Sequence, residues 1–338
     1  MKRINKQTYI GVDGLELQVN TDSTKLRKEN IESKELYSKR TGVKIGRVKA
    51  INSTGFRLYI NLPQMVRANN IRPFGIIDKI YLEEVLNEIT GILYEFCVDV
   101  HNALVSTVEI NATAQLDSKK SVECIMNLLA LMFLQEGKKV FLTAHGKKNS
   151  YKSVPLSYDI LRNTYQIESL KTPRLGNKAF SWKFYDKGLE EGIQDKGVLR
   201  LEQVHNSRSL KREGLPQRLD LFLTSENILK LISIYRRSFQ RYFIDVYWKY
   251  GRQCFVDKCV NTILFELKEE SPLSAAKVHK NLISIDFEIF ERACRLFYPN
   301  QKTATQTIRR VRNSGKIEVN KGAVRELVQV FRAILYSK

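Results

Sequence analysis

The sequence predicts an α+β fold, in which helices flank an antiparallel sheet, followed by a C-terminal domain built only of helices. Two observations predict this class. Short segments of alternating apolar and polar residues occupy the first two thirds of the chain, whereas apolar residues recur at helical spacing from Ser225 onward. We therefore expect two domains, residues 1–223 and residues 224–338.

The sheet is predicted from segments whose side chains alternate. Residues 8–19 alternate with a β-branched and leucine bias, and the segment from Asn52 to Gly55 separates two strand patterns that form a hairpin, because Asn and Gly tolerate the positive φ of tight turns. Residues 105–113 alternate cleanly and place Glu109 on a polar face. Strands are expected over residues 8–19, 44–51, 56–63, 105–113, 139–145, 179–187 and 197–205.

Helices are predicted from apolar side chains three or four residues apart. Residues 76–96 follow this spacing, and Asp117 and Ser118 can cap a helix that runs to about Gln135. Two stretches predict no element: residues 21–41 are charged without a strong period, and residues 146–178 form a basic, loop-rich stretch. In the helical C-terminal part, breaks are expected at Gly251, near Ser271 and Pro272, at Pro299 and at Gly315.

The charge of the chain predicts an anionic partner. Lys and Arg number 56 against 36 Asp and Glu, a formal net charge of +20. Nucleic acid is the first expectation and an anionic membrane surface the second, since no basic amphipathic anchor stands out. The apolar run at residues 125–134 is well short of the ~20 residues that cross a bilayer. No secretory signal and no zinc-finger cysteine spacing are evident, so we expect a cytoplasmic protein with reduced thiols.

The segment 181–187 carries the first candidate chemistry. Lys183, Tyr185 and Lys187 point to one side of a strand, so a phenol lies between two ammonium groups. A phenol has a pKa near ~10 and becomes a good nucleophile only when cations or a metal stabilise its anion. The same cations would bind a phosphodiester. The alternative is a half-exposed strand tyrosine beside solvated lysines.

Carboxylates on neighbouring strands predict a metal site. Arg200 and Glu202 share a face of the strand at 197–205, and Glu109 lies on the polar face of its own strand. Hard oxygen ligands suit Mg²⁺ or Mn²⁺. His145 at a strand end and His205 could complete the ligand set. The alternative is that the glutamates are ion-pair partners and the histidines are surface or hydrogen-bonded imidazoles.

The C-terminal part contains a candidate helix-turn-helix. Residues 271–319 could form this motif, with a recognition helix at 302–315 that presents Arg309, Arg310 and Arg312, followed by the short strand-like segment KIEV. The alternative is a basic helix that occurs by chance in a basic protein.

Two runs together carry a family resemblance. SWKFYDKGLEEG, followed by GVLRLEQVHNSRSLKREGLP, resembles the signature of the filamentous-phage gene II (gene II/X type) family of rolling-circle replication initiators. In that family a strand ending in tyrosine, a variable residue and lysine precedes a strand with an Arg, apolar, Glu core. Here these positions are Tyr185 with Lys187, and Arg200 with Glu202. A basic stretch with a Gly-Leu-Pro-like turn follows at 210–216.

The resemblance is specific over residues 179–216 and looser over residues 8–222. Glu109 takes the position of the family's strand aspartate, and Thr107 stands where the family usually has arginine. The His-apolar-His pair that supplies metal ligands in many rolling-circle initiators does not occur in this sequence.

The resemblance implies a metal-dependent enzyme that nicks and rejoins DNA at a phage or plasmid origin. Tyr185 would attack the scissile phosphodiester to give a 5′-phosphotyrosine, while Lys187 and Arg200 offset the charge of the transition state. Glu109 and Glu202, with His145, would hold Mg²⁺ or Mn²⁺.

The implied partner is origin DNA, both duplex and single-stranded. Lys183 and the arginines Arg309, Arg310 and Arg312 are its candidate contacts. A host polymerase and helicase are further candidate partners in the cytoplasm of a bacterial host, and no membrane is involved.

Two other functions remain open. One is a non-catalytic, sequence-specific DNA-binding replication protein that uses the C-terminal helices. The other is a structural or interaction protein that assembles on RNA or on a replication complex. Only the enzyme requires Tyr185, Lys187, Arg200 and Glu202 together on adjacent strands.

Overall fold

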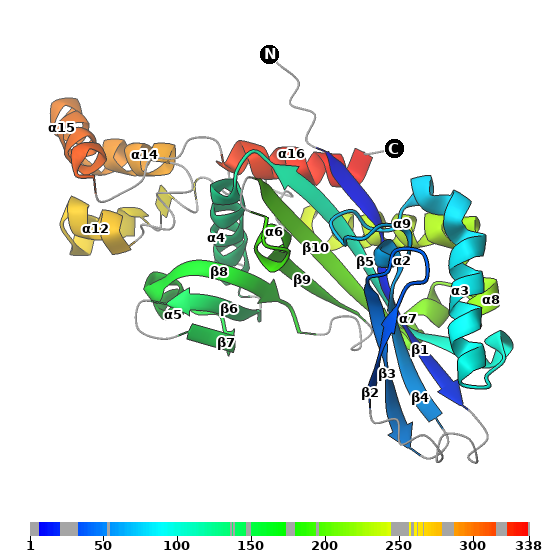
Figure 1. Cartoon of the computed structure of the whole chain (residues 1–338). Coiled ribbons are helices and arrows are strands. Elements are labelled where there is room, and N and C mark those ends of the chain that lie inside the picture. The colour runs from blue at the N-terminus through cyan, green and yellow to red at the C-terminus, as the bar shows by residue number, and fades with distance from the viewer. Residues whose placement is uncertain are drawn as a thin grey trace.

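The computed structural model (Figure 1) describes residues 7–20, 33–52, 55–135, 137, 139–146, 150–173, 180–193, 196–244, 257, 260–261, 263–265, 267–278, 287–315 and 323–336. Within these ranges, ten strands form one antiparallel sheet in the order β2-β3-β4-β1-β5-β10-β9-β8-β6-β7. The fold is α+β, as the sequence predicts. The strands are β1 (Thr8–Asn20), β2 (Ser33–Tyr37), β3 (Lys44–Asn52), β4 (Gly55–Asn61), β5 (Ala103–Leu116), β6 (Phe141–Gly146), β7 (Ser150–Pro155), β8 (Thr164–Lys171), β9 (Phe180–Asp186) and β10 (Gly197–Asn206).

Helices cover the apolar face of this sheet. Helix α4 contacts β10, β8 and β9, while α9 and α16 contact β1. In the N-terminal part the helical elements are α2 (Leu62–Val66), η1 (Ile76–Tyr81), α3 (Leu82–Glu95), η2 (Val100–Asn102), α4 (Lys119–Gln135), α5 (Tyr158–Asn163), α6 (Lys187–Glu190), α7 (Ser207–Arg212) and α8 (Leu219–Phe222). The C-terminal part contains α9 (Ser225–Phe239), η3 (Gln240–Ile244), α12 (Pro272–Val278), α14 (Phe287–Phe297), α15 (Gln301–Asn313) and α16 (Ala323–Tyr336).

An aromatic cluster joins the sheet to the helices. Trp182 on β9 is fully buried, and its ring centroid lies 5.2 Å from Tyr235, 6.1 Å from Phe239 and 4.9 Å from Phe243. These contacts place Trp182 and Phe184 in the core, so neither ring is available to stack on a base. Because alternate residues of a strand face opposite sides, the polar side chains of β9 are directed to the other face of the sheet.

Three strands and one helix arise where the sequence predicted no element. The edge strand β2 lies in the charged stretch 21–41, and only its Leu36 is buried, so an apolar alternation is absent. The stretch 146–178, predicted to be a loop, contains β7, α5 and β8. Strand β7 is a largely exposed edge strand, and register shifts interrupt the pairing of β6 with β8, so the two-residue period is broken there.

The C-terminal helices begin or end where the sequence predicts breaks. Helix α12 begins at Pro272, α14 ends at Phe297 before Pro299, and α15 ends at Asn313 before Gly315. The predicted break at Gly251 and the segment KIEV lie outside the described residues.

Two groups of C-terminal helices are distinct in Figure 1. Helices α12, α14 and α15 lie together beyond one side of the sheet, whereas α9 and α16 pack on the sheet itself. The domain boundary after residue 223 stays a prediction. Across the described ranges, we find no helix with the length and apolarity needed to span a membrane.

The aromatic cluster predicts the effect of removing its largest member. We expect Trp182→Ala to lower the free energy of unfolding by about 3–5 kcal/mol, because the surrounding rings cannot close the cavity. Tyr94→Ala is the control, since that side chain is exposed on α3 and its loss should change stability by less than about 0.5 kcal/mol. Urea denaturation followed by circular dichroism measures both. Equal stability losses in the two variants would contradict the assigned core.

Candidate active site

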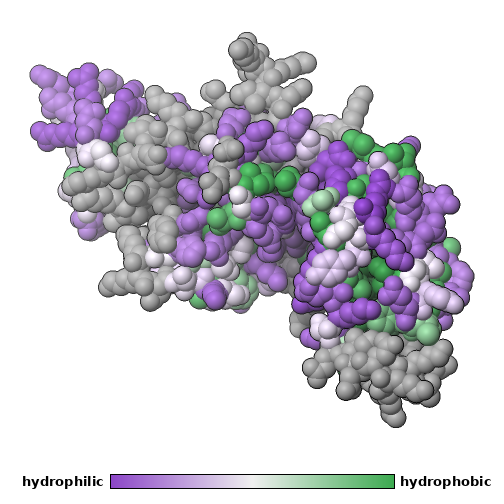
Figure 2. All heavy atoms as spheres, viewed as in Figure 1, coloured by the Kyte–Doolittle hydropathy of each residue, from purple (hydrophilic) through white to green (hydrophobic). Residues whose placement is uncertain are grey.

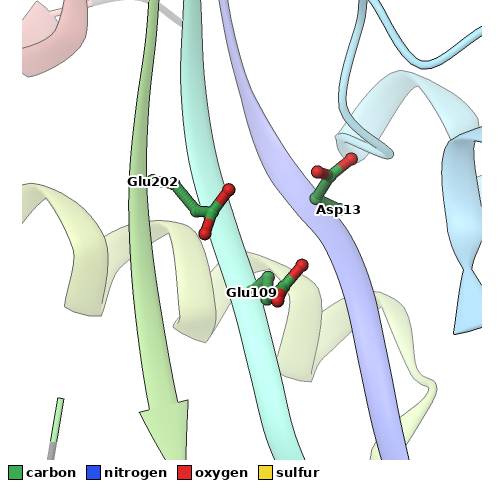
Figure 3. A group of neighbouring side chains, drawn as sticks. All are labelled: Asp13, Glu109 and Glu202. Atoms are coloured by element: carbon green, nitrogen blue, oxygen red, sulfur yellow. The ribbon is translucent and has the colours of Figure 1, made fainter. Parts of the chain in front are cut away.

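Three carboxylates converge on the polar face at the centre of the sheet. Asp13 comes from β1, Glu109 from β5 and Glu202 from β10, which are consecutive strands of the sheet (Figure 3). Each residue offers one carboxylate oxygen, and these oxygens lie within 4.8 Å of one another. Glu109 and Glu202 were predicted from the sequence, whereas Asp13 was not.

A local irregularity of β1 directs Asp13 into this group. Val12 pairs with Ile110 of β5 and Gly14 pairs with Glu109, so Asp13 has no partner on β5. Such a bulge re-aims the side chain of the extra residue. The sequence carries its signal, because the aliphatic residues of this strand fall on even numbers up to Val12 and on odd numbers from Leu15.

Burial and mutual repulsion act on all three carboxyl groups. Burial raises the pKa of Glu109 to about 8, with the negative charges of Glu202 and Asp13 acting in the same direction. Burial also raises the pKa of Glu202, and Lys183 opposes the rise. The pKa of Asp13 is raised by burial as well, against the lowering effect of Arg200. Arg200 and Lys183 therefore offset the negative charge of the three carboxyl groups only in part.

The donor set fits a divalent cation. Three carboxylates supply the hard oxygen ligands that Mg²⁺ and Mn²⁺ prefer. Asp13 also has a buried oxygen, Oδ1, that accepts no hydrogen bond from any described residue. A cation at this position would satisfy that oxygen and offset the repulsion among the three groups.

Arg200 is a fully buried partner of Asp13. Its Nη1 lies 3.1 Å from Asp13 Oδ2, and its Nε donates to Thr113 Oγ1 at 3.1 Å. Its Nη groups also donate to the side chain and carbonyl of Asn70 and, at 2.9 Å, to the carbonyl of Ile71. The guanidinium is thus occupied by protein groups, and this geometry suits a residue that holds Asp13 better than one that contacts phosphate.

The loop that carries Asn70 is itself fixed by ion pairs. The carboxylate of Asp78 accepts hydrogen bonds from Arg67 at 2.6 Å, from Arg72 at 2.9 Å and from the Gly75 amide at 3.0 Å. Residue Phe74 then forms a β-bridge with Val12. These contacts hold the loop beside the bulge in β1, where Asn70 accepts hydrogen bonds from Arg200.

Tyr185 lies beside the carboxylates on β9. Its hydroxyl donates to Glu202 Oε2 at 3.1 Å, and Lys183 Nζ lies 4.1 Å from the centroid of its ring. Burial raises the pKa of the Tyr185 phenol, and the charge of Glu202 raises it further. The phenol is therefore neutral, and the carboxylate that could take its proton is already its hydrogen-bond partner.

Lys187 has a different setting from the one its spacing suggested. Strand β9 ends at Asp186, whose side chain caps the short helix α6 by accepting from the Leu189 amide. Lys187 opens that helix, and its Nζ lies 2.6 Å from Glu190 and 2.7 Å from Glu191. Its ammonium is therefore bound by carboxylates in and directly after α6, and Lys183 is the lysine that lies over the phenol.

The two candidate histidines do not join the carboxylates. His145 lies on β6, and its Nε2 is 2.5 Å from Glu168 of β8. Strands β8 and β9 separate β6 from β10. His205 is buried on β10, where its Nδ1 is 2.8 Å from Ser209 Oγ and its ring stacks on Phe180. Burial lowers the pKa of His205 to about 4.

A polar groove of about 710 Å³ leads away from the carboxylates. Glu109 and Glu202 line one end of it, Lys183 and Lys171 line the middle, and Phe141 of β6 contributes a partly exposed ring. The lining residues come from neighbouring strands between β5 and β7, so the groove runs across the strands of the sheet.

The C-terminal arginines divide into two kinds. Arg309 and Arg310 are exposed on α15, and side chains over this helix form a hydrophilic surface (Figure 2). Arg312 instead pairs with Glu291 of α14 and lies 5.1 Å from the ring of Phe287. Arg312 thus fixes α15 on α14, while the other two arginines face outward.

Comparison with models of protein families and with curated proteins finds no match to this sequence. Among solved structures, the chain is similar to one described as a rolling circle replication initiator protein from Geobacillus stearothermophilus. That similarity covers 70% of this chain and 86% of the other, with 11% sequence identity and a TM-score of 0.38. A likeness this distant carries no argument about function.

The cluster of three carboxylates predicts a response to divalent cations. Mn²⁺ should raise the melting temperature of the protein, with a gain of about 2.7 kcal/mol at a concentration one hundred times its dissociation constant. Glu109→Gln should remove this response and leave the cation-free protein no less stable than the parent, because burial already disfavours the charged form of this carboxyl group. Differential scanning fluorimetry with and without Mn²⁺ measures both. A variant that keeps the full Mn²⁺ response would exclude Glu109 as a ligand.

Proposed function

We propose that this chain is a rolling-circle DNA replication initiator. In this proposal it is a site-specific, metal-dependent endonuclease and strand transferase that nicks one strand of a phage or plasmid origin through a 5′-phosphotyrosine. One observation carries the proposal: the Tyr185 hydroxyl donates to Glu202, a member of the carboxylate triad, with Lys183 over its ring. A nucleophile, its proton acceptor and a cation for the developing charge are thus adjacent.

The chemical step follows from this arrangement. The Tyr185 oxygen attacks phosphorus while its proton passes to Glu202 Oε2, 3.1 Å away. The bond from Tyr185 oxygen to phosphorus forms, the bond from phosphorus to the 3′-oxygen breaks, and the 3′-oxygen takes a proton from water. The phosphotyrosine conserves the bond energy, so a later 3′-hydroxyl can attack it, release the phenol and close the strand.

The other side chains hold these groups in place. Lys183 offsets the charge that builds up near the phenol, Arg200 fixes Asp13, and Lys187 pairs with Glu190 within α6. Asp13, Glu109 and Glu202 would hold Mg²⁺ or Mn²⁺, which supplies charge neutralisation at a phosphate oxygen. Lys183 takes the role that the sequence suggested for Lys187.

Single-stranded DNA suits the groove beside the three carboxylates. Lys171 and Lys183 are placed to contact phosphates, and the Phe141 ring offers a surface for a base, a contact worth about 1–3 kcal/mol. The net charge of +20 supports broad phosphate contacts as well. Duplex origin DNA is assigned to the exposed face of α15. The free 3′-hydroxyl would prime a host polymerase, with a host helicase as a further partner, in the bacterial cytoplasm.

The proposal is tested with a supercoiled plasmid that carries the cognate origin. With Mg²⁺ or Mn²⁺ the parent protein should relax the plasmid and remain covalently attached to it, because the 5′-phosphate stays on tyrosine. Tyr185→Phe should give neither relaxation nor attachment. Tyr235→Phe is the matched control, since its hydroxyl donates to the Leu201 carbonyl and takes no part in the site.

Two outcomes would contradict this assignment. Nicking by Tyr185→Phe at the parent rate would exclude Tyr185 as the nucleophile. A parent protein that binds the origin and never nicks it would favour the non-catalytic DNA-binding function.

The α15 arginines predict a separate effect on duplex binding. Arg309→Ala with Arg310→Ala should weaken binding to origin duplex and reduce the slope of log affinity against log salt by about 1.8, the value for two phosphate contacts. Cleavage of a short single-stranded substrate should not change. Arg47→Ala with Arg57→Ala removes the same charge from the β3–β4 hairpin and serves as control. Equal losses of duplex affinity in both double variants would show that the loss depends on net charge alone and would exclude α15 as the duplex-binding element.

A further inference from the structure

A second phenol contacts the carboxylate triad from the side opposite to Tyr185. Tyr59 lies on β4, and its hydroxyl donates to Glu109 Oε2 at 2.9 Å. In the sheet, β1 lies between β4 and β5, so the Tyr59 side chain must cross β1 to reach Glu109. The chemistry proposed for Tyr185 does not use this contact.

Gly14 is the residue that permits the crossing. A Cβ atom added at this position would lie 2.6 Å from the Tyr59 hydroxyl, 2.9 Å from Glu109 Oε2 and 3.0 Å from Tyr59 Cε2. The first two distances are too short for a Cβ contact and the third is unusually tight, so any side chain at position 14 would displace the phenol, the carboxylate or both. Gly14 pairs with Glu109, directly beside the bulge that aims Asp13.

Glu109 needs an external restraint for two reasons. Asp13 and Glu202 repel it, and its side chain has one more rotatable bond than that of Asp13, so it can turn away from the other two carboxylates at little cost. A hydrogen bond to one carboxylate oxygen fixes the side chain and leaves the other oxygen available. Outer partners of this kind set the orientation of metal ligands in proteins.

We infer that Tyr59 is a positioning residue that holds Glu109 in the orientation required of a metal ligand, and that Gly14 is present to let its hydroxyl reach that carboxylate. This inference rests on the metal site of the proposed function. Tyr59 is suited to be a donor and not a second nucleophile, because in the described part of the chain Lys183 lies over the Tyr185 ring and no lysine or arginine lies over that of Tyr59.

The test is direct binding of Mn²⁺ to the whole 338-residue chain, followed by the electron paramagnetic resonance signal of free Mn²⁺. Tyr59→Phe removes only the hydroxyl and should weaken Mn²⁺ binding by about ten- to hundredfold. Tyr235→Phe removes a buried hydroxyl on the other face and should keep the parent affinity. Gly14→Ala should weaken binding by a similar factor, and adding it to Tyr59→Phe should have less effect than in the parent.

Three results would overturn the inference: Mn²⁺ affinity in Tyr59→Phe within twofold of the parent, equal weakening in Tyr59→Phe and Tyr235→Phe, or no Mn²⁺ binding by the parent. Thermal melts of each cation-free variant separate loss of fold from loss of the ligand. The readout does not depend on nicking. A parent that binds Mn²⁺ through a Tyr59-dependent site and never nicks an origin would therefore refute the proposed function and leave the role of Tyr59 intact.

Discussion

Repulsion among three carboxylates is the constraint to which the rest of the site responds. Asp13, Glu109 and Glu202 lie within 4.8 Å of one another on a largely buried surface, where charges interact more strongly than in water. Arg200 compensates Asp13, and Lys183 acts on the other two carboxyl groups. In the proposed function, the remaining negative charge would bind a divalent cation, and Glu202 would accept the proton of Tyr185.

The sheet holds the mutually repelling carboxylates and Tyr185 in a fixed geometry. Strands β1, β5, β10 and β9 are consecutive and contribute Asp13, Glu109, Glu202 and Tyr185 in that order. The opposite face of β9 is held by Trp182 within an aromatic cluster, so the strand that carries the phenol cannot shift freely. The apolar core thereby stabilises the distance between the Tyr185 hydroxyl and Glu202, which is the quantity that the proposed chemistry depends on.

The alternation of residues within single strands was enough to predict most of the site residues. Contacts that depend on the pairing of several strands could not be predicted in this way. The alternation of β5, β9 and β10 was enough to place Glu109, Glu202 and Tyr185 on polar faces. The bulge at Asp13 was encoded by a change of phase in the apolar residues, a signal that a uniform period of two overlooks. Tyr59 could not be found, because its contact requires the pairing of three strands and an opening at Gly14. Lys187 lies outside β9, because the cap at Asp186 ends that strand one residue earlier than the alternation predicted, and its catalytic role stays a prediction.

The identity of the residue that becomes joined to DNA tests the central claim most directly. After reaction with a single-stranded origin oligonucleotide and Mn²⁺, proteolysis and tandem mass spectrometry of the covalent product locate the attached nucleotide. The account predicts a phosphodiester-linked nucleotide on the peptide that contains Tyr185, at its phenol oxygen. Attachment to any other residue, or cleavage of the oligonucleotide without attachment, would contradict it.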